Sequence, residues 1–93
     1  MVSHCQVYDI AGFAGLPCQP TVIVDGTFAP PPMQRALEHG ATAVMHSTTK
    51  YLSGHSDAIG GALCVGDEAL AARLFAQRTA MGAVPGALEV WLL

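Results

Sequence analysis

The 93-residue chain is poor in positive charge: it has four Lys and Arg residues against seven Asp and Glu, and its net charge is −3 at pH 7. A nucleic-acid-binding domain needs a stripe of basic side chains, and an anionic membrane surface attracts a cluster of them. The basic residues here are scattered, at Arg35, Lys50, Arg73 and Arg78. The sequence therefore argues against nucleic acid and against a membrane surface as partners.

Targeting segments and cysteine pairs are also missing. The sequence has no apolar run of the roughly 20 residues that cross a membrane, and no basic start followed by the apolar core of a signal peptide. We therefore expect a cytoplasmic location. Cys5, Cys18 and Cys64 form no C-x-x-C pair, which argues against a disulfide framework and a structural zinc site, and predicts reduced, mostly buried thiols.

Apolar residues, by contrast, are abundant. They make up 52% of the chain while charged residues make up 12%, so there is more apolar surface than a domain of this length can easily hide. We expect part of it to contact another chain or another part of the protein. The last apolar run ends on Trp91, Leu92 and Leu93 without a cap or a polar terminus, which is typical of a piece of a longer protein.

The order of expected elements is typical of one α/β domain. Continuous β-branched or apolar runs predict strands at 21–25, 41–46 and 61–65, the first of them covered on both faces. Helical patterns and capping residues predict helices over 7–16, ended by Pro17; over 33–40, closed by Gly40; from the cap Asp67 to Gly82; and over 86–93. Residues 47–61 are polar and glycine-rich and predict a loop.

Lys50 is the only lysine, and it lies in the segment HSTTKYLSGHSD. A lone lysine is usually a surface residue. A second interpretation takes Ser47 and Lys50 as the S-x-x-K of a serine hydrolase, but no second lysine is present for the K-T-G strand of those enzymes. In the third, Lys50 is a Schiff-base nucleophile that follows a buried strand and has no carboxylate beside it in sequence.

The residues near Lys50 favour the third interpretation. Ser47, Thr48 and Thr49 supply short hydroxyl donors suited to a phosphate, and a phosphate together with a Schiff-base lysine suggests pyridoxal 5′-phosphate (PLP). That cofactor needs a carboxylate at its pyridine nitrogen, and Asp25 ends the first predicted strand, where ligand sites of open α/β sheets gather. Asp25 and Gly26 could instead form a hairpin turn, but the prolines that follow could not form the returning strand.

Residues 22–61, VIVDGTFAPPPMQRALEHGATAVMHSTTKYLSGHSDAIGG, resemble the Cys/Met-metabolism (transsulfuration) family of fold type I PLP enzymes, and the likeness runs from about Val7 to the C-terminus. The family includes cystathionine γ-synthase, cystathionine and methionine lyases and O-acylhomoserine sulfhydrylases. The resemblance implies part of a large PLP-binding domain with a mixed, mostly parallel sheet flanked by helices. It also implies that Lys50 forms the internal aldimine and acts as base, that Asp25 pairs with the pyridinium, and that Ser47 and Thr49 bind the phosphate.

The resemblance further implies an amino-acid substrate carrying sulfur or an activated homoserine, elimination or replacement at Cβ or Cγ, and a homo-oligomer. It supplies no metal, so His46, His55 and Asp57 are expected to fix the loop around Lys50 by hydrogen bonds. Gly26 stands where the family usually has Asn. The family's N-terminal region and C-terminal small domain have no counterpart in residues 1–93, so a non-catalytic remnant or interaction module stays open as an alternative.

Overall fold

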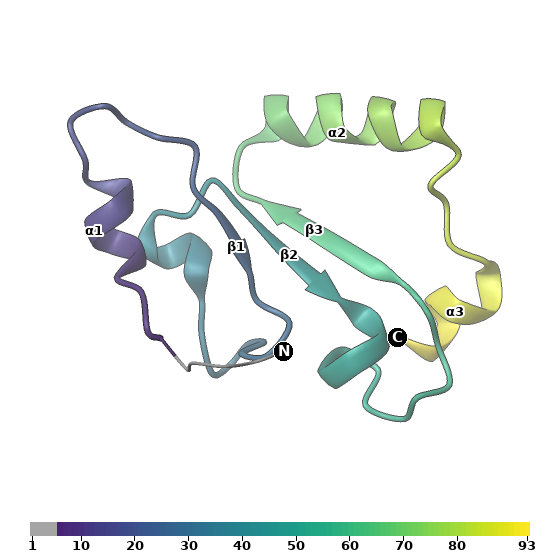
Figure 1. Cartoon of the computed structure of the whole chain (residues 1–93). Helices are drawn as coiled ribbons and strands as arrows, with labels where there is room; N and C mark the ends of the chain where they lie inside the picture. Colours follow the sequence, from purple (N-terminus) through teal and green to yellow (C-terminus); the bar gives the residue numbers. More distant parts are fainter. Residues whose placement is uncertain (1–5) are drawn as a thin grey trace.

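The computed structural model describes residues 6–93, and a three-stranded sheet in the order β1-β2-β3 lies at its centre (Figure 1). The strands are β1 (Ile23–Asp25), β2 (Ala43–Ser47) and β3 (Gly61–Val65). β1 pairs with β2 in parallel, and β2 pairs with β3 in antiparallel orientation. The predicted mixed sheet with flanking helices is therefore confirmed. Cys5 and the rest of residues 1–5 lie outside the described part.

The parallel pairing of β1 with β2 decides where the candidate site residues lie. In the register, Ile23 is opposite Ala43 and Asp25 is opposite Met45. Gly26 continues this alignment by donating its N–H to the Met45 carbonyl at 2.8 Å. Both strands therefore end at the same edge of the sheet. The hairpin that Asp25 and Gly26 could have formed is absent from these residues.

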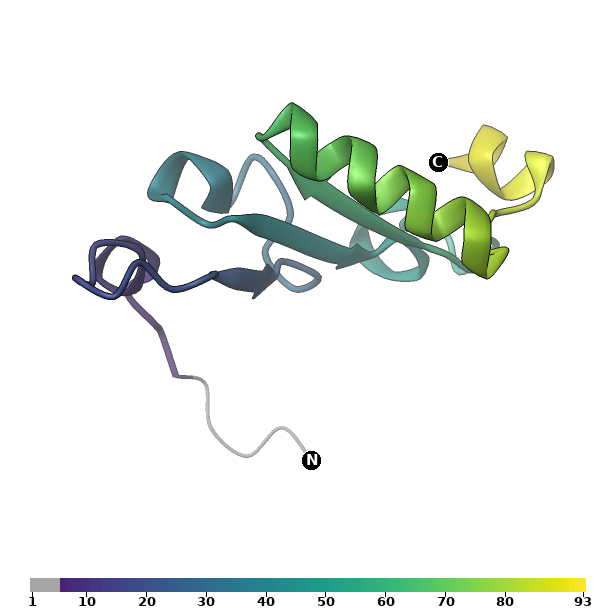
Figure 2. The ribbon, with the colours of Figure 1, turned by 90° about the horizontal axis from the view of Figure 1, so that it is seen from above.

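The longest helix begins and ends where its capping residues predict. α2 spans Glu68–Met81, the Asp67 carboxylate accepts a hydrogen bond from the Leu70 N–H, and Gly82 ends the helix with a φ of 67°. α3 spans Ala87–Leu92 and confirms the predicted last helix. In Figure 2, α2 runs along β3, and α1 lies at the opposite end of the sheet.

The two helices predicted before β2 are shorter than their sequence patterns indicate. α1 spans only Ile10–Ala14, because the Asp9 carboxylate caps its start and the chain leaves the helix at Gly15 instead of Pro17. The segment predicted as helix 33–40 forms one 3₁₀ turn, η1 (Ala36–His39), which follows the prolines and ends at Gly40 with a φ of 90°. Gly40 as the closing residue is confirmed.

Part of the predicted 47–61 loop is a helical turn, η2 (Thr48–Leu52), so the prediction was wrong there. The turn is kinked at Lys50, whose ψ of −115° is not helical. Two backbone bonds close it, from the Ser53 N–H to the Thr48 carbonyl at 3.0 Å and from the Gly54 N–H to the Lys50 carbonyl at 2.9 Å. These local bonds give structure to a segment whose composition indicates only a loop.

The core is small and lies over one face of β1 and β2. It consists of Ala36, Ala41 and Val44, with Ile10, Val22 and Val24 packed against them. Burial of β1 on both faces was wrong, because no described layer covers Ile23, which is 65% exposed. Cys18 and Cys64 are free thiols as predicted, but both are exposed because Cys18 lies in a loop and little packs over Cys64. Within residues 6–93, we find no helix with the length and apolar character that crossing a bilayer requires.

Candidate functional site

The candidate site lies where β1 and β2 end. Asp25 is the last residue of β1, and Ser47 is the last residue of β2. Because these strands are parallel neighbours, both side chains are carried at the carboxyl edge of the sheet, the edge at which open α/β sheets bind ligands. Thr49 and Lys50 follow directly in η2. The structure thus gathers the four predicted residues on two adjacent segments.

Thr27 links the two strand ends. Its hydroxyl oxygen accepts a hydrogen bond from the Ser47 N–H at 2.9 Å, and its own N–H donates to the Asp25 carboxylate at 3.0 Å. The Thr27 hydroxyl and then the Thr27 N–H lower the pKa of the Asp25 carboxyl below its usual range; slight burial opposes them, and the charge of His46 adds a minor lowering effect. Asp25 is exposed, and its contacts with Thr27 further favour the ionised form of its carboxyl.

The two predicted phosphate ligands differ in how they are engaged. Among residues 6–93, the half-buried Ser47 has a hydroxyl with no hydrogen-bond partner. The Thr49 hydroxyl oxygen accepts a bond from the Gly60 N–H at 3.0 Å, and the contact that it would donate to the Gly60 carbonyl is long, at 3.4 Å. Both hydroxyl protons are therefore available to an anionic ligand.

Lys50 is exposed, and its ammonium forms no ion pair with any described carboxylate. A Schiff-base lysine becomes more reactive when it is shielded from water, but the described residues leave Lys50 open to solvent. Ser47 precedes η2 in an extended conformation, and the backbone at Lys50 is not helical. Ser47 and Lys50 therefore do not share a regular helical turn, which speaks against the serine-hydrolase interpretation.

The nearby His residues play unequal parts in the loop. His55 fixes it as expected, since its Nδ1 lies 2.7 Å from the Ser53 carbonyl oxygen. His46 does not: its ring is buried, and Nδ1 has no partner among the described residues. No hydrogen bond of the Asp57 side chain is found in the described part. The described residues also contain no group of three His, Cys, Asp or Glu side chains that could hold a metal ion.

Gly26 allows the chain to turn directly over the His46 ring. A Cβ atom at Gly26 would lie 2.5 Å from His46 Cε1 and 3.0 Å from Val44 Cγ1. Such distances are well inside van der Waals contact. A side chain at position 26 would therefore require His46 or Val44 to shift.

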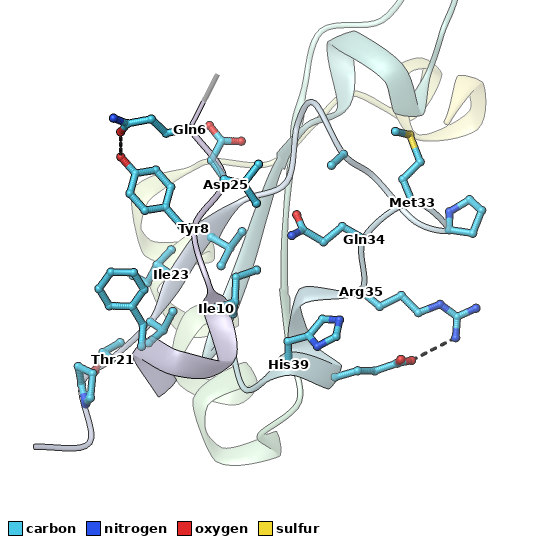
Figure 3. Close-up of a pocket in the computed structure, with 18 residues that line it drawn as sticks. Gln6, Tyr8, Ile10, Thr21, Ile23, Asp25, Met33, Gln34, Arg35 and His39 are labelled. Atoms are coloured by element: carbon cyan, nitrogen blue, oxygen red, sulfur yellow. Dashed lines mark hydrogen bonds and ion pairs between the residues drawn. The ribbon is translucent and has the colours of Figure 1, made fainter. Parts of the chain in front are cut away.

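A groove of about 1110 Å³ borders the site along β1. Its walls come from α1 and the segment before it, from residues 20–25, and from the segment 29–39. In Figure 3, Asp25 lies in the same part of the view as Gln6 and Tyr8, whose hydroxyl donates to the Gln6 side chain at 2.6 Å. The ion pair of Arg35 with Glu38 lies on the other side of the groove (Figure 3). Asp25 is thus accessible to a ligand from this groove.

Thr27 and Gly60 are the site residues that the sequence interpretation missed. Thr27 bonds both Asp25 and Ser47, and Gly60 bonds Thr49. A signal existed for part of the first contact, because an Asp side chain often accepts from the backbone N–H two residues later. No local pattern could have shown that the Thr27 hydroxyl reaches Ser47.

An α/β sheet with a carboxylate, phosphate-suited hydroxyls and a lysine at its carboxyl edge is typical of the class of enzymes that hold PLP. Comparison with known proteins gives the family: residues 3–93 match the model described as Cys/Met metabolism PLP-dependent enzyme, and the chain belongs to that family. A probable cystathionine gamma-synthase of Herpetosiphon aurantiacus is 49% identical over 71 residues, which cover 76% of this chain and 22% of that protein.

The chain is also similar in fold to solved structures of PLP-dependent lyases. Apo CalE6, a methionine gamma lyase from Micromonospora echinospora, matches 92% of this chain and 24% of its own with a TM-score of 0.87 and 43% identity. Cystathionine gamma-lyase of Lactobacillus plantarum, complexed with L-serine, matches 94% of this chain and 23% of its own with a TM-score of 0.89 and 37% identity. The fold is that of PLP-dependent lyases and synthases, and the chain spans about a quarter or less of the relatives it matches.

Proposed function

We propose that residues 1–93 form part of the large PLP-binding domain of a transsulfuration enzyme, and that Lys50 is the residue that attaches the cofactor. One observation carries the proposal. Asp25 and Ser47 end adjacent parallel strands and are linked through Thr27. The only lysine of the chain follows three residues after Ser47 and has no ion pair within residues 6–93.

The side chains of the site fit PLP. When bound, PLP supplies an electron-accepting ring that stabilises a carbanion at the Cα of an amino acid. The lowered pKa of Asp25 keeps a carboxylate available for the protonated ring nitrogen. Ser47 and Thr49 each have a hydroxyl proton that can be donated to a phosphate oxygen. The donor set therefore matches the three ends of the cofactor: nitrogen, phosphate and aldehyde.

Lys50 has two tasks in this proposal. Its Nζ would hold the cofactor, and as a free amine it would take up the Cα proton of the substrate and return it later. An ammonium tied in an ion pair could do neither, and no such pair holds Lys50 among the described residues. Residues 6–93 leave Lys50 exposed, so its shielding from water would require residues outside this part or another chain.

The substrate is proposed as a class: an amino acid with sulfur in its side chain, or an activated homoserine, undergoing elimination or replacement at Cβ or Cγ. The relatives include a probable cystathionine gamma-synthase and a methionine gamma lyase, so likeness alone does not choose one reaction. A homo-oligomer and a cytoplasmic location stay predictions from the sequence, to be tested by sedimentation and by cell fractionation.

A PLP titration tests the proposal. The purified chain is titrated with PLP, and visible absorption and circular dichroism are recorded beside the Lys50→Ala and Asp25→Asn variants. We expect an induced visible band that Lys50→Ala abolishes and Asp25→Asn weakens. Saturated protein is then offered methionine, cystathionine, or O-acylhomoserine with cysteine, and keto-acid and amino-acid products are measured. A PLP-loaded chain without turnover would favour the non-catalytic alternative, and an unchanged band in Lys50→Ala would overturn the role of Lys50.

A further inference from the structure

Two exposed aromatic side chains meet beside the candidate site. Phe28 lies three residues after Asp25, and Tyr51 directly follows Lys50. Their ring centroids are 6.2 Å apart and the rings are inclined at 62°, an edge-to-face arrangement. Phe28 is 74% and Tyr51 62% exposed. Because so little of either ring is buried, the contact is better explained by the attraction of one ring edge to the other ring face than by removal from water.

The pair joins the two segments that carry the proposed site residues. Phe28 belongs to the turn that leaves β1, and Tyr51 belongs to η2. Two hydrogen bonds join the Asp25 turn to β2: the Gly26 N–H donates to the Met45 carbonyl, and the Ser47 N–H donates to the Thr27 hydroxyl. The aromatic contact joins the same turn to η2, and it does so between exposed side chains.

The kink at Lys50 is restrained within η2 by backbone bonds, but these bonds do not join η2 to the Asp25 turn. The backbone at Lys50 leaves the helical conformation, the Ser53 N–H spans it by bonding the Thr48 carbonyl, and the Gly54 N–H bonds the Lys50 carbonyl. The Tyr51 ring, on the next residue, contacts Phe28 outside η2. The ring contact therefore adds a restraint between the two turns that the bonds within η2 do not supply.

We propose that Phe28 and Tyr51 are positioning residues whose edge-to-face contact holds the Asp25 turn against η2 and so sets the separation of the Asp25 carboxylate and the Lys50 amine. The inference rests on the proposed function. The aldehyde group of PLP is attached to the ring carbon opposite the ring nitrogen, and the ring is rigid. Two groups that hold these ends must keep a fixed separation, and small displacements of such groups weaken binding and reaction.

The test uses the 93-residue chain, with Phe28→Ala, Tyr51→Ala and the double variant. Tyr51→Phe keeps the ring without the hydroxyl. Phe75→Ala is the matched control, because Phe75 is 61% exposed and its ring contacts Arg78 within α2. The first readout, which needs no cofactor, is hydrogen exchange of the Ser47 amide that bonds Thr27, with the Val44 and Cys64 amides as reference for the sheet. The second is the PLP concentration that gives half-maximal borohydride-trapped adduct.

We expect each alanine variant of the pair to speed Ser47 exchange and raise the half-saturating PLP concentration by about twofold to tenfold, the range of one aromatic pair. The double variant should exchange Ser47 no faster, and need no more PLP for half-saturation, than either single variant. Tyr51→Phe and Phe75→Ala should match the unsubstituted chain in both readouts. Unchanged Ser47 exchange in both single variants, additive effects, or an equal effect of Phe75→Ala would overturn the proposal. So would a Ser47 amide that is unprotected in the unsubstituted chain.

The two readouts separate this inference from the proposed function. If the unsubstituted chain forms no adduct on Lys50, the proposed function fails, and Ser47 exchange still decides whether the ring pair positions the turn. If the adduct forms but neither readout responds to the alanine variants, the proposed function stands and the positioning role is wrong.

Discussion

At the scale of single residues, Thr27 sets the geometry and the charge of the site. Its hydroxyl oxygen accepts the Ser47 N–H, and its backbone N–H donates to the Asp25 carboxylate. The Thr27 side chain is the largest cause of the lowered pKa of Asp25, followed by this backbone N–H. Removing the hydroxyl should therefore change the titration of a residue two positions away.

We predict that Thr27→Val raises the pKa of Asp25 toward the ordinary value of about 3.9, while Thr27→Ser preserves the lowered value. Titration of the Asp25 side-chain carboxyl by carbon-detected NMR measures both. In the parent chain, the folded pKa lies below the unfolded one. The contribution of Asp25 to stability is therefore complete above about pH 3.9 and is lost as pH falls through the folded value. Equal pKa values in Thr27→Val and the parent would contradict this account.

Gly26 supports a second prediction at this scale. A Cβ at this position meets the His46 ring and Val44, so Gly26→Ala should lower the free energy of unfolding by about 1 to 3 kcal/mol, as overpacking does. Urea denaturation followed by circular dichroism measures it. Combining Gly26→Ala with His46→Ala should cost less than the sum of the two single changes, because the ring that clashes is gone. Additive costs would show that the two residues do not share this space.

The sequence alone identifies candidate site residues whose chemistry is rare in the chain. It does not show contacts between residues that are distant in sequence. Lys50 and Asp25 are recognisable because one lysine and one strand-ending aspartate stand in chemically suited surroundings. The Thr27 to Ser47 bond and the fit of Gly26 to His46 join residues about 20 positions apart. These contacts depend on the β1–β2 register, which no local pattern specifies.

At the scale of elements, capping residues made the ends of α2 predictable, whereas the Asp9 cap and Gly15 shortened α1, and η1 forms only after the prolines. Asp67 accepts the Leu70 N–H, and Gly82 adopts the left-handed conformation that favours glycine. The predicted helix 7–16 contains Gly12 and Gly15, and its first residue, Val7, is 99% exposed outside α1. The composition of residues 47–61 indicates a loop and does not predict η2, because η2 is formed by a few local backbone bonds.

We predict that Asp67→Ala destabilises α2 by about 1 kcal/mol, the usual cost of losing an N-cap, and that Asp67→Asn loses only a small part of this. Hydrogen exchange of the Leu70 amide in both variants measures the effect. The β2–β3 amides serve as an internal control, since they lie in a different element. Equal Leu70 exchange in the parent and Asp67→Ala would show that the cap contributes nothing.

At the scale of the whole molecule, the described residues leave much apolar surface uncovered, as the composition predicts. Exposed large side chains occur on most elements, and they include Val7, Phe28, Met33, Ile59, Phe75 and Trp91. Patches of this kind mark surfaces that associate. The sequence could predict the excess, but not which faces would be open, because that depends on how helices cover the sheet.

We therefore predict that the isolated chain associates with itself as concentration rises, and that sodium chloride does not disperse the complexes, because apolar contacts are not screened by salt. Sedimentation velocity over a concentration series measures this. A chain that stays monomeric at every concentration would contradict the prediction, and dispersal by salt would assign the association to charge instead.

The central claim, that Lys50 is the residue that attaches PLP, is tested most directly by reduction with borohydride in the presence of PLP, intact-mass measurement and peptide mapping. Because Lys50 is the only lysine, the N-terminal amine is the one other primary amine of the chain. We predict one stable adduct that maps to Lys50 and is missing from Lys50→Ala. An adduct found only at the N-terminus, or retained at full yield in Lys50→Ala, would contradict the account.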